Sequence, residues 1–388
     1  MPTAIIGSAQ HWTAPIRLSA HHLARYLSKK GWRICFVSTP TSFMHRLRFY
    51  SDPIRRERYS LAKHGMHYDA KEKIHYYTPL TYLPPSRLPV LRRKWFFDSW
   101  PKFTYPHLLR TLDLHGFSCP DVVIFDSVAM NSVWELLGRP NLVYRVTDNN
   151  ADFPGLPELI PVIEKQMAQH ARMVTYTGSA LERYVDGLDV ENTLCVPNGV
   201  DYSHFANAMA PPEEYKYIPE PRALYVGSIA SWFDEDLVKA VAGNSPDTSF
   251  VIIGPGSESL KKLANHSNVH LLGARSYQHV PAYLQHAQVG IIPFKPDGCQ
   301  AFFDDINPLK LYEYMAAGLP VVSTAINQVK MLNSPAKIAK NKHEFSSAII
   351  EFCSSSEQKI AEKKFAKSHD WEHQFHALHK QIVNMINP

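Results

Sequence analysis

Short apolar runs alternate with amphipathic segments along most of the chain. The runs at 4–7, 33–38, 122–125, 142–146 and 173–176 have the length of buried strands. Apolar positions with helical spacing fill several of the intervals, at 16–30, 131–137 and 159–170. Strands and helices that alternate in this way are typical of a parallel sheet covered by helices. The first part of the chain therefore predicts a doubly wound α/β domain.

The same alternation begins again at Ala223 and continues through apolar runs at 250–253, 269–272, 289–292 and 321–323. Between the two series, residues 206–221 are rich in Pro, Ala, Tyr and Glu and have little apolar periodicity, which is typical of a linker. The domains that we expect are an N-terminal Rossmann-like domain, a linker, a second Rossmann-like domain and a last helix, at 1–205, 206–221, 222–370 and 371–388.

Composition is that of a folded enzyme of two domains. The chain has 388 residues, of which 45% are hydrophobic and 20% charged, which excludes disorder as its main state. No apolar run reaches the roughly 18 residues that span a bilayer, and we expect no secretory signal at the N-terminus. The five cysteines have no CxxC spacing. This argues against a zinc site or a disulfide framework and favours a reducing cytosol.

Positive charge is concentrated in residues 1–110, which carry 19 Lys and Arg against 5 Asp and Glu, whereas the rest carries 22 against 31. Between 46 and 102 the basic residues are interleaved with aromatic ones, as in RLRFY, IRRERY and LRRKWFFDSW. This mixture suits an anionic membrane surface, but it also suits nucleic acid or an ordinary soluble face. Of these three interpretations we favour the anionic membrane surface, and we expect no nucleic acid partner. The residues expected to contact the membrane are Arg92, Arg93, Lys94 and Trp95.

One segment, DDINPLKLYEYMAAGLPVVST at 304–324, predicts a helix of about three turns over 309–317. Pro308 suits the first helical position, and Gly318 suits the left-handed conformation that ends a helix. The helix N-terminus offers free N–H groups to a diphosphate, and Lys310 adds a full charge there. Glu313 lies on the same face, where a carboxylate can accept two ribose hydroxyls. From spacing alone, a solvated surface helix is the commoner interpretation.

The run PLKLYEYMAAGLPVV resembles the donor-site segment of GT-B glycosyltransferases, in particular family 4 and the membrane-associated glucuronosyltransferase of xanthan biosynthesis. Further segments resemble their counterparts in the same order: VYRVTDNN, VPNGVDYSHF, YVGSIASWFD, VIIGPGSE and NVHLLGARSYQHVPAYLQHAQVGIIPF. The resemblance covers about residues 142–324. It implies the GT-B fold, two Rossmann-like doubly wound parallel-sheet domains that face each other across a cleft, with a last helix that crosses back to the first domain.

Asp148 follows the strand at 142–146, at the edge where open α/β sheets bind ligands. An aspartate there can accept the proton of an acceptor hydroxyl, although an aspartate before two asparagines is more often a turn or cap residue. The resemblance of VYRVTD implies that Asp148 is the catalytic base. His11, Trp12 and Arg17 follow the first strand, and we expect them to contact the acceptor, although a lone histidine is usually structural.

The donor site is expected to include four more residues. Gly227 and Ser228 close the first strand of the second domain, where a glycine lets the backbone approach a phosphate, or simply forms a tight turn. Phe294 either stacks on a uracil ring or belongs to the core. Leu309 begins the predicted helix beside Lys310. The turn GPG at 254–256 lacks the GxGxxG pattern, which gives a redox dinucleotide little support.

One departure from family 4 leaves the stereochemistry open. Those enzymes usually have two glutamates eight positions apart, and here the later one is Glu313 while Asp305 occupies the earlier position. We therefore keep Asp305 as a possible catalytic or donor-sugar residue. Asp304 and Asp305 could hold a divalent ion, but enzymes of this class normally stabilise the diphosphate with a helix dipole and basic side chains. We expect no metal and no cofactor besides the substrate.

The sequence predicts a glycosyltransferase that moves a hexose or hexuronic acid from a nucleotide diphosphate sugar, UDP-glucuronate for example, to a polyprenyl-linked oligosaccharide. The expected setting is exopolysaccharide or cell-envelope polysaccharide biosynthesis, in the cytoplasm at the inner face of the cytoplasmic membrane. The expected partners are the nucleotide-sugar donor, the lipid-linked saccharide acceptor and an anionic membrane surface. Two alternatives stay open: a transferase that acts on a soluble or protein acceptor, and a non-catalytic protein that binds nucleotide sugars.

Overall fold

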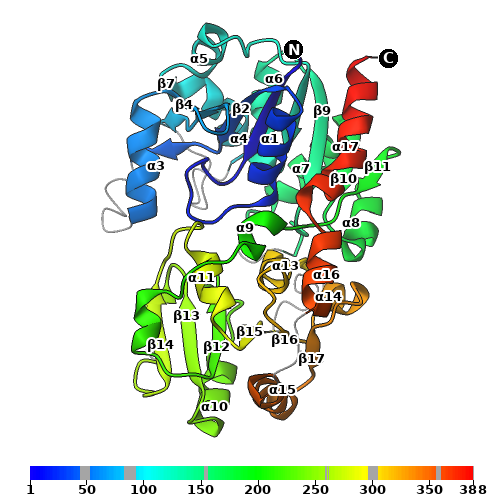
Figure 1. Ribbon diagram of the computed structural model, residues 1–388. Helices are drawn as coiled ribbons and strands as arrows, with labels where there is room; N and C mark the ends of the chain where they lie inside the picture. Colours follow the sequence, from blue (N-terminus) through cyan, green and yellow to red (C-terminus); the bar gives the residue numbers. More distant parts are fainter. Residues whose placement is uncertain are drawn as a thin grey trace. The chain divides into compact units, whose positions relative to one another are not determined.

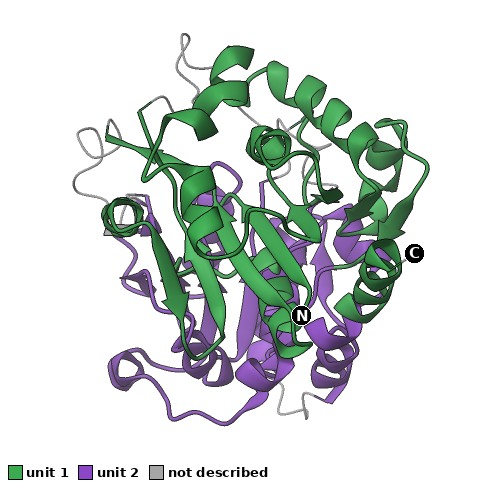
Figure 2. Ribbon diagram, turned by 90° about the horizontal axis from the view of Figure 1, so that it is seen from above, with its two compact units in different colours: residues 1–197, 375–388 green, residues 198–374 purple. Residues whose placement is uncertain are grey.

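The computed structural model describes residues 1–43, 53–82, 93–152, 156–257, 260, 262–295, 305–354 and 360–387. The chain divides into two compact units (Figure 1, Figure 2). The first consists of Met1–Pro197 with Phe375–Pro388, and the second of Asn198–Gln374. Each unit is built on its own sheet, parallel throughout in the second unit and parallel except at one edge in the first, so the predicted pair of doubly wound α/β domains is confirmed.

In the first unit, the described residues form an eight-stranded sheet in the order β11-β10-β9-β8-β1-β2-β5-β4. Neighbouring strands are parallel except β4 and β5, which are antiparallel. The strands are β1 (Thr3–Ser8), β2 (Arg33–Ser38), β4 (Met66–Asp69), β5 (Ile74–Tyr77), β8 (Val122–Phe125), β9 (Asn141–Val146), β10 (Met173–Tyr176) and β11 (Thr193–Cys195). A small second sheet contains β3 (Thr41–Ser42), β6 (Leu80–Thr81) and β7 (Thr104–Tyr105).

Helices cover the large sheet because each carries an apolar stripe. In α7, for example, Ile160, Ile163 and Met167 lie in one core cluster with Leu142 and Val146 of β9. The helices of this unit are α1 (Ser19–Lys29), α3 (Pro53–Lys63), α4 (Lys94–Ser99), α5 (Leu108–Leu114), α6 (Asn131–Leu136), α7 (Leu159–His170), α8 (Glu182–Asp186) and most of α17 (Trp371–Ile386). Short 3-10 turns lie at η1 (Trp100–Phe103), η2 (Val128–Met130) and η3 (Ser179–Leu181).

The last helix packs on the first unit through its aromatic and histidine side chains. The ring centroids of Tyr26 and Phe375 lie 5.8 Å apart. The indole N–H of Trp32 donates to Nε2 of His379 at 3.1 Å. These contacts tie α17 to α1 and to the start of β2.

In the second unit, the described residues form a six-stranded sheet in the order β14-β13-β12-β15-β16-β17, with all neighbours parallel. The strands are β12 (Arg222–Val226), β13 (Ser249–Ile253), β14 (Val269–Gly273), β15 (Val289–Ile292), β16 (Val321–Thr324) and β17 (Lys337–Ala339). The helices are α9 (Tyr202–Ala206), α10 (Glu235–Asn244), α11 (Val280–Gln285), α13 (Leu309–Ala316), α14 (Asn327–Met331), α15 (Lys342–Ser354) and α16 (Ile360–Ser368), with the 3-10 turn η4 (Glu213–Lys216).

The segment expected as a linker, 206–221, belongs to the second unit. Tyr215 is buried, and the guanidinium of Arg222 lies 4.3 Å from its ring centroid. The same guanidinium donates to the carbonyls of Tyr215 and Ile218 at 3.1 and 2.8 Å. One arginine therefore packs this segment against the start of β12.

The helix of the donor segment is shorter than predicted. It has eight residues, about two turns rather than three, and Pro308 is its N-cap rather than its first helical residue. Gly318 has φ of +77°, and the N–H of Leu319 donates to the carbonyl of Tyr314 at 2.9 Å. The helix thus ends at the predicted glycine.

Candidate functional site

The ends of β12 and β13 in the second unit meet at two glycines, whose lack of side chains lets the two backbones approach closely. Gly227 follows β12 with φ of +154°, and Gly254 follows β13 with φ of +150°. A Cβ atom on Gly254 would lie 1.8 Å from the carbonyl oxygen of Gly227. A Cβ atom on Gly227 would lie 3.1 Å from Nζ of Lys310. Glycine is therefore required at 254, and at 227 it leaves room for Lys310 beside the backbone.

Two tyrosine hydroxyls fix this arrangement. Tyr225 donates to the carbonyl of Ser228 at 2.9 Å, which shapes the turn after β12. The N–H of Val226 donates to the hydroxyl of Tyr314 at 2.7 Å, so α13 is bonded to the end of β12. Gly290 on β15 makes room for the Tyr314 ring, since a Cβ atom there would lie 2.3 Å from it. These contacts hold Lys310 at the carboxyl edge of the sheet, where open α/β sheets bind ligands.

Lys310 is a cation held against aromatic rings. Its Nζ lies 4.8 Å from the ring centroid of Phe294 and 5.2 Å from that of Tyr225. Burial lowers the pKa of Lys310 to about 8, although Glu313 opposes the shift. Burial also raises the pKa of Glu313 to about 7, with Lys310 opposing. Both side chains are still partly exposed, so an anion that reaches Lys310 would stabilise its charged form.

The structure therefore brings together Gly227, the carbonyl of Ser228, Phe294, Lys310 and Glu313. Phe294 is only 4% exposed and its ring faces the Lys310 ammonium, which favours the core alternative over stacking on uracil. Leu309 and Asp305 are partly buried. Asp304 lies outside the described residues.

In the first unit, Asp148 lies just beyond β9 at the carboxyl edge of the sheet. The hydroxyl of Thr147 donates to its Oδ2 at 3.1 Å. Burial raises the pKa of Asp148. A carboxylate with a raised pKa binds a proton more tightly than a solvated one does, which suits a general base.

A residue that sequence reasoning missed anchors the loop of Asp148. Glu164 of α7 is fully buried. It accepts hydrogen bonds from the hydroxyls of Tyr144 and Tyr184, both at 2.6 Å, and from the amide of Asn150 at 3.0 Å. Because Asn150 is two residues from Asp148, Glu164 positions the end of this loop. The sequence signal that could have identified Glu164 as buried is its position on the apolar stripe of α7, between Ile160 and Met167.

Glu164→Ala is expected to lower the free energy of unfolding by about 2 to 4 kcal/mol, since it leaves the buried hydroxyl of Tyr144 and the partly buried donors of Tyr184 and Asn150 without their acceptor. Glu164→Gln keeps one acceptor oxygen and should lose less. Chemical denaturation at neutral pH measures both. Glu158→Ala, an exposed change at the start of the same helix, is the matched control and should stay within about 0.5 kcal/mol of wild type. Equal losses at 158 and 164 would contradict the anchoring role.

The three residues expected to contact the acceptor lie near the end of β1. His11 is fully buried, and its Nε2 has no hydrogen-bond partner among the described residues. Burial and the neighbouring Arg58 lower its pKa to about 4, so it is neutral at pH 7. Trp12 is 2% exposed and its indole donates to Asp69 at 2.9 Å, so this side chain is part of the core. Arg17 stays partly exposed, with its guanidinium 5.3 Å from the Trp12 ring centroid.

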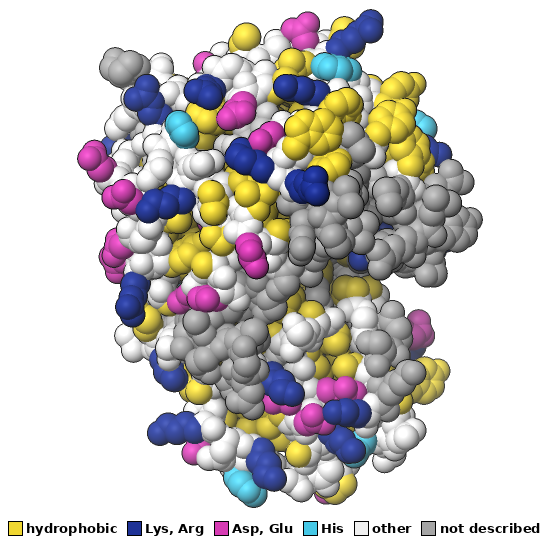
Figure 3. Space-filling view, turned by 180° about the vertical axis from the view of Figure 1, so that it is seen from behind, with side chains coloured by type: hydrophobic (Ala, Val, Ile, Leu, Met, Phe, Trp, Pro, Cys, Tyr) yellow, Lys and Arg dark blue, Asp and Glu magenta, His cyan; other side chains and the backbone are white. Residues whose placement is uncertain are grey.

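Of the residues expected at the membrane, Arg93, Lys94 and Trp95 are exposed on and beside α4, and Arg92 lies outside the described residues. Lys94 forms an ion pair with Asp98 at 2.8 Å. Figure 3 shows exposed hydrophobic side chains with Lys and Arg among them on one face of the molecule. In the parts that the structure describes, no helix is both long and apolar enough to cross a membrane.

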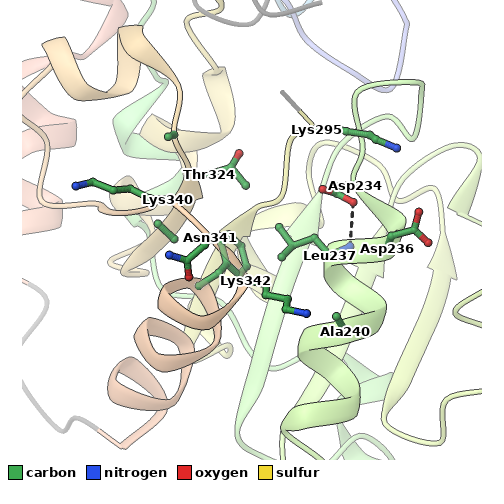
Figure 4. Close-up of a pocket in the computed structure, with 12 residues that line it drawn as sticks. Asp234, Asp236, Leu237, Ala240, Lys295, Thr324, Lys340, Asn341 and Lys342 are labelled. Carbon is green, nitrogen blue, oxygen red and sulfur yellow. Dashed lines mark hydrogen bonds between the residues drawn. The ribbon is translucent and has the colours of Figure 1, made fainter. Parts of the chain in front are cut away.

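A separate hollow of about 570 Å³ lies in the second unit (Figure 4). Lys295 and Asp234 line one side, while Lys340, Asn341 and Lys342 line the other. It contains none of the residues expected to bind the donor, and we assign it no part in the site. No cluster of three or more His, Cys, Asp or Glu able to hold a metal ion occurs in the described part of the chain.

Comparison with known protein families gives two matches. Residues 6–177 match the family described as glucuronosyltransferase GumK, N-terminal domain. Residues 220–355 match the family described as glycosyl transferases group 1. Together these matches include Asp148 in the first region and Gly227, Lys310 and Glu313 in the second.

Among curated proteins, the chain is 30% identical over 245 residues to a protein of Bacillus subtilis (strain 168) named as a teichuronic acid biosynthesis glycosyltransferase, TuaH. The match covers 60% of this chain and 57% of that relative, so the chain spans little more than half of its length.

Solved structures share the fold. Sucrose-phosphate synthase from Thermosynechococcus elongatus has a TM-score of 0.70 at 15% identity and covers 98% of this chain and 99% of its own. Anabaena Alr3699/HepE in complex with UDP and glucose has a TM-score of 0.68 at 12% identity and covers 99% of both chains. The GT-B fold expected from the sequence is confirmed.

Proposed function

We propose that this chain, which belongs to the GT-B glycosyltransferases, transfers a hexose or hexuronic acid from a UDP-sugar such as UDP-glucuronate to a polyprenyl-linked oligosaccharide of a cell-envelope polysaccharide. The proposal depends on one observation: the partly exposed cation Lys310 lies next to the backbone of Gly227, which has no side chain. The description of the GumK family, the name of TuaH and the UDP-sugar complexes of HepE support the substrate class.

The second unit would bind the donor. Lys310 would neutralise the charge of the diphosphate. The diphosphate would also accept hydrogen bonds from the N–H groups at the start of α13 and would approach the backbone at Gly227. Glu313 would accept hydrogen bonds from the ribose hydroxyls. As the bond between the sugar and the diphosphate breaks, charge grows on the leaving oxygen, and Lys310 stabilises it. We propose that these groups suffice without a metal ion.

The first unit would supply the base. Asp148 takes the proton from the acceptor hydroxyl while that oxygen bonds to the anomeric carbon, and UDP leaves with the electron pair of the broken bond. Such a single displacement inverts the anomeric centre. Glu164 keeps the loop of Asp148 in place through Asn150.

Thermal unfolding with a panel of ligands tests the donor. A ligand at 100 times its Kd stabilises the native state by about 2.7 kcal/mol, which raises the midpoint by several degrees. We expect this rise with UDP and with one of UDP-glucuronate, UDP-glucose, UDP-galactose and UDP-N-acetylglucosamine, and none with GDP-mannose. A midpoint unchanged by every UDP compound would refute the proposed donor.

We also propose that the first unit binds an anionic membrane surface, with no nucleic acid partner. An aromatic patch, formed by Phe43, Tyr82, Trp95 and Phe103, supports this. The rings of Phe43 and Tyr82 lie 5.2 Å apart and those of Trp95 and Phe103 5.9 Å apart, while the N–H of Tyr82 donates to the carbonyl of Phe103. Trp95 and Phe103 are 52% and 40% exposed. Aromatic rings beside Arg93 and Lys94 suit the headgroup region of a bilayer.

The wild-type protein is expected to sediment with anionic phospholipid vesicles and not with zwitterionic ones. Binding should weaken as salt approaches about 1 M, where the screening length falls to about 3 Å. The double variant Trp95→Ser and Phe103→Ser should release most of the protein without changing UDP affinity. Tyr217→Ser, which removes an aromatic ring that is 82% exposed on the second unit, is the control and should bind as wild type does. Equal sedimentation with anionic and zwitterionic vesicles would contradict the proposal.

A further inference from the structure

The chain enters the second unit through an entry segment, PNGVD at 197–201, since that unit begins at Asn198. This segment pairs with the residues around the start of α17. The N–H of Val200 donates to the carbonyl of His369, and the N–H of Trp371 donates to the carbonyl of Val200, both at 3.0 Å. The backbone of the entry segment is therefore fixed within the second unit.

Two further residues of the entry segment hold it in this place. A Cβ atom on Gly199 would lie 2.4 Å from the carbonyl oxygen of His369, so the pairing requires a residue without a side chain there. Asp201 is the N-cap of α9, and its Oδ1 accepts a hydrogen bond from the N–H of His204 at 3.1 Å. Because the segment is held on both sides, the position of Asn198 is well defined.

Asn198 is hydrogen-bonded to the residue that precedes the cap of the donor helix. It is 9% exposed, and its Nδ2 donates to the carbonyl of Asn307 at 2.8 Å. Its buried Oδ1 has no partner among the described residues. Asn307 immediately precedes Pro308, the N-cap of α13. The hydroxyl of Tyr312, on α13 itself, donates to Oδ1 of Asn307 at 2.8 Å. Asn307 thus joins the entry segment to the first turn of α13.

The two turns of α13 are held by different contacts. In the second turn, the hydroxyl of Tyr314 is bonded to the N–H of Val226 on β12. The first turn carries Lys310, and the backbone just before it is held by the amide of Asn198. Loss of this amide should therefore loosen the start of α13 and leave the second turn, with Glu313, in place.

We propose that Asn198 is a positioning residue for the donor, which holds the backbone of Asn307 and so places Lys310 and the first N–H groups of α13 to receive a diphosphate. The inference rests on the proposed function, in which the diphosphate binds at the start of α13. A site that is already ordered loses less conformational freedom when its ligand binds. The hydrogen bond from Asn198 therefore raises the affinity for a diphosphate through Asn307.

A comparison of UDP with uridine tests this role, because only UDP carries the diphosphate. Asn198→Ala should weaken UDP binding about three- to tenfold, since it removes one hydrogen bond between neutral groups. Asn198→Asp keeps the shape but sets a carboxylate oxygen against the carbonyl of Asn307, and should weaken it about tenfold or more. Uridine affinity should stay near the wild-type value in both. Isothermal titration measures UDP binding, and NMR titration measures uridine binding.

Asn268→Ala is the control for a general loss of stability. Asn268 lies just before β14, at the amino edge of the same sheet. Its amide donates to the carbonyls of Ala242, Ser245 and Thr248, each at 3.0 Å. Its loss should lower the midpoint of thermal unfolding at least as much as Asn198→Ala does, with UDP affinity unchanged. An equal loss of UDP affinity in Asn268→Ala would overturn the positioning role.

Amide hydrogen exchange in the free protein gives a measurement that needs no ligand. The N–H of Leu311, which donates to the carbonyl of Pro308 at 3.1 Å, should exchange faster in Asn198→Ala and as in the wild type in Asn268→Ala. If exchange or UDP affinity is unchanged in Asn198→Ala while the wild type binds UDP, the inference is overturned. If exchange rises but the wild type binds no UDP, the anchoring of α13 stands and the proposed function fails.

A second variant covers the case in which Asn198→Ala does not fold. Tyr312→Phe removes the other hydrogen bond to Asn307 and keeps the ring, whose centroid lies 5.9 Å from that of Phe365 in a stacked arrangement. It should weaken UDP binding about three- to tenfold and leave uridine affinity near the wild-type value. UDP affinity equal to that of the wild type in this variant would count against the anchoring through Asn307.

Discussion

Asp148→Asn is expected to lower the rate of sugar transfer by about 10² to 10⁴ while UDP affinity stays near the wild-type value. The amide keeps the shape of the side chain and can still accept the hydrogen bond from Thr147, but it cannot take a proton from the acceptor. Single-turnover rates with saturating UDP-sugar, together with calorimetric titration of UDP, separate the chemical step from binding.

Asp152→Asn is the matched control for this variant, because Asp152 is an exposed carboxylate in the same loop, and it should transfer at close to the native rate. Stereochemistry provides an independent measurement. A single displacement with Asp148 as base converts an α-linked donor into a β-linked product. An α-linked product, or a native transfer rate in Asp148→Asn, would show that Asp148 is not the base. Asp305 and Glu313 would then be the carboxylates to test.

Lys310→Ala is expected to weaken UDP binding by about ten- to a hundredfold, because a charge-assisted contact contributes about 1.5 to 3 kcal/mol. The fold should survive, since the charged end of Lys310 lies against the rings of Phe294 and Tyr225 and forms no hydrogen bond or ion pair with described residues. Isothermal titration with UDP measures the loss. Lys340→Ala, which removes a cation from the separate hollow of the same unit, should bind UDP as wild type does.

The affinity should also depend on pH in a defined direction. Lys310 has a pKa of about 8 in the free protein, so its charge is present below that pH and is lost as pH rises through it. UDP affinity should therefore fall above about pH 8, and Lys310→Arg should flatten the dependence because arginine stays charged. An affinity that is constant across this range in the wild type would show that the diphosphate does not contact Lys310.

Local sequence pattern was sufficient for many elements of the two sheets and their helices. The strands at 33–38, 122–125, 173–176 and 289–292 and the helix at 159–170 occur at the residues that the pattern predicts. Their apolar residues are β-branched or periodic, and these local preferences agree with burial in the fold. The region 53–114 is different: α3, β4, β5, α4 and α5 lie in a basic and aromatic stretch where periodicity predicted no element. There, packing against the rest of the unit decides the secondary structure.

The sequence by itself determined the α/β class, the alternation of strands and helices outside 53–114 and the residues at several strand ends, since these follow from period, turn residues and motif resemblance. It placed Gly227, Lys310, Glu313 and Asp148 near sheet edges, but it could not place Phe294 and Trp12 in the core. Burial depends on neighbours that are distant along the chain. For the same reason, only the tertiary structure showed that Tyr314 bonds α13 to β12, and that Asn198 bonds Asn307, 109 residues further along the chain. Such long-range pairing, like the register between strands, is a property of the folded unit, and no local stretch of sequence encodes it.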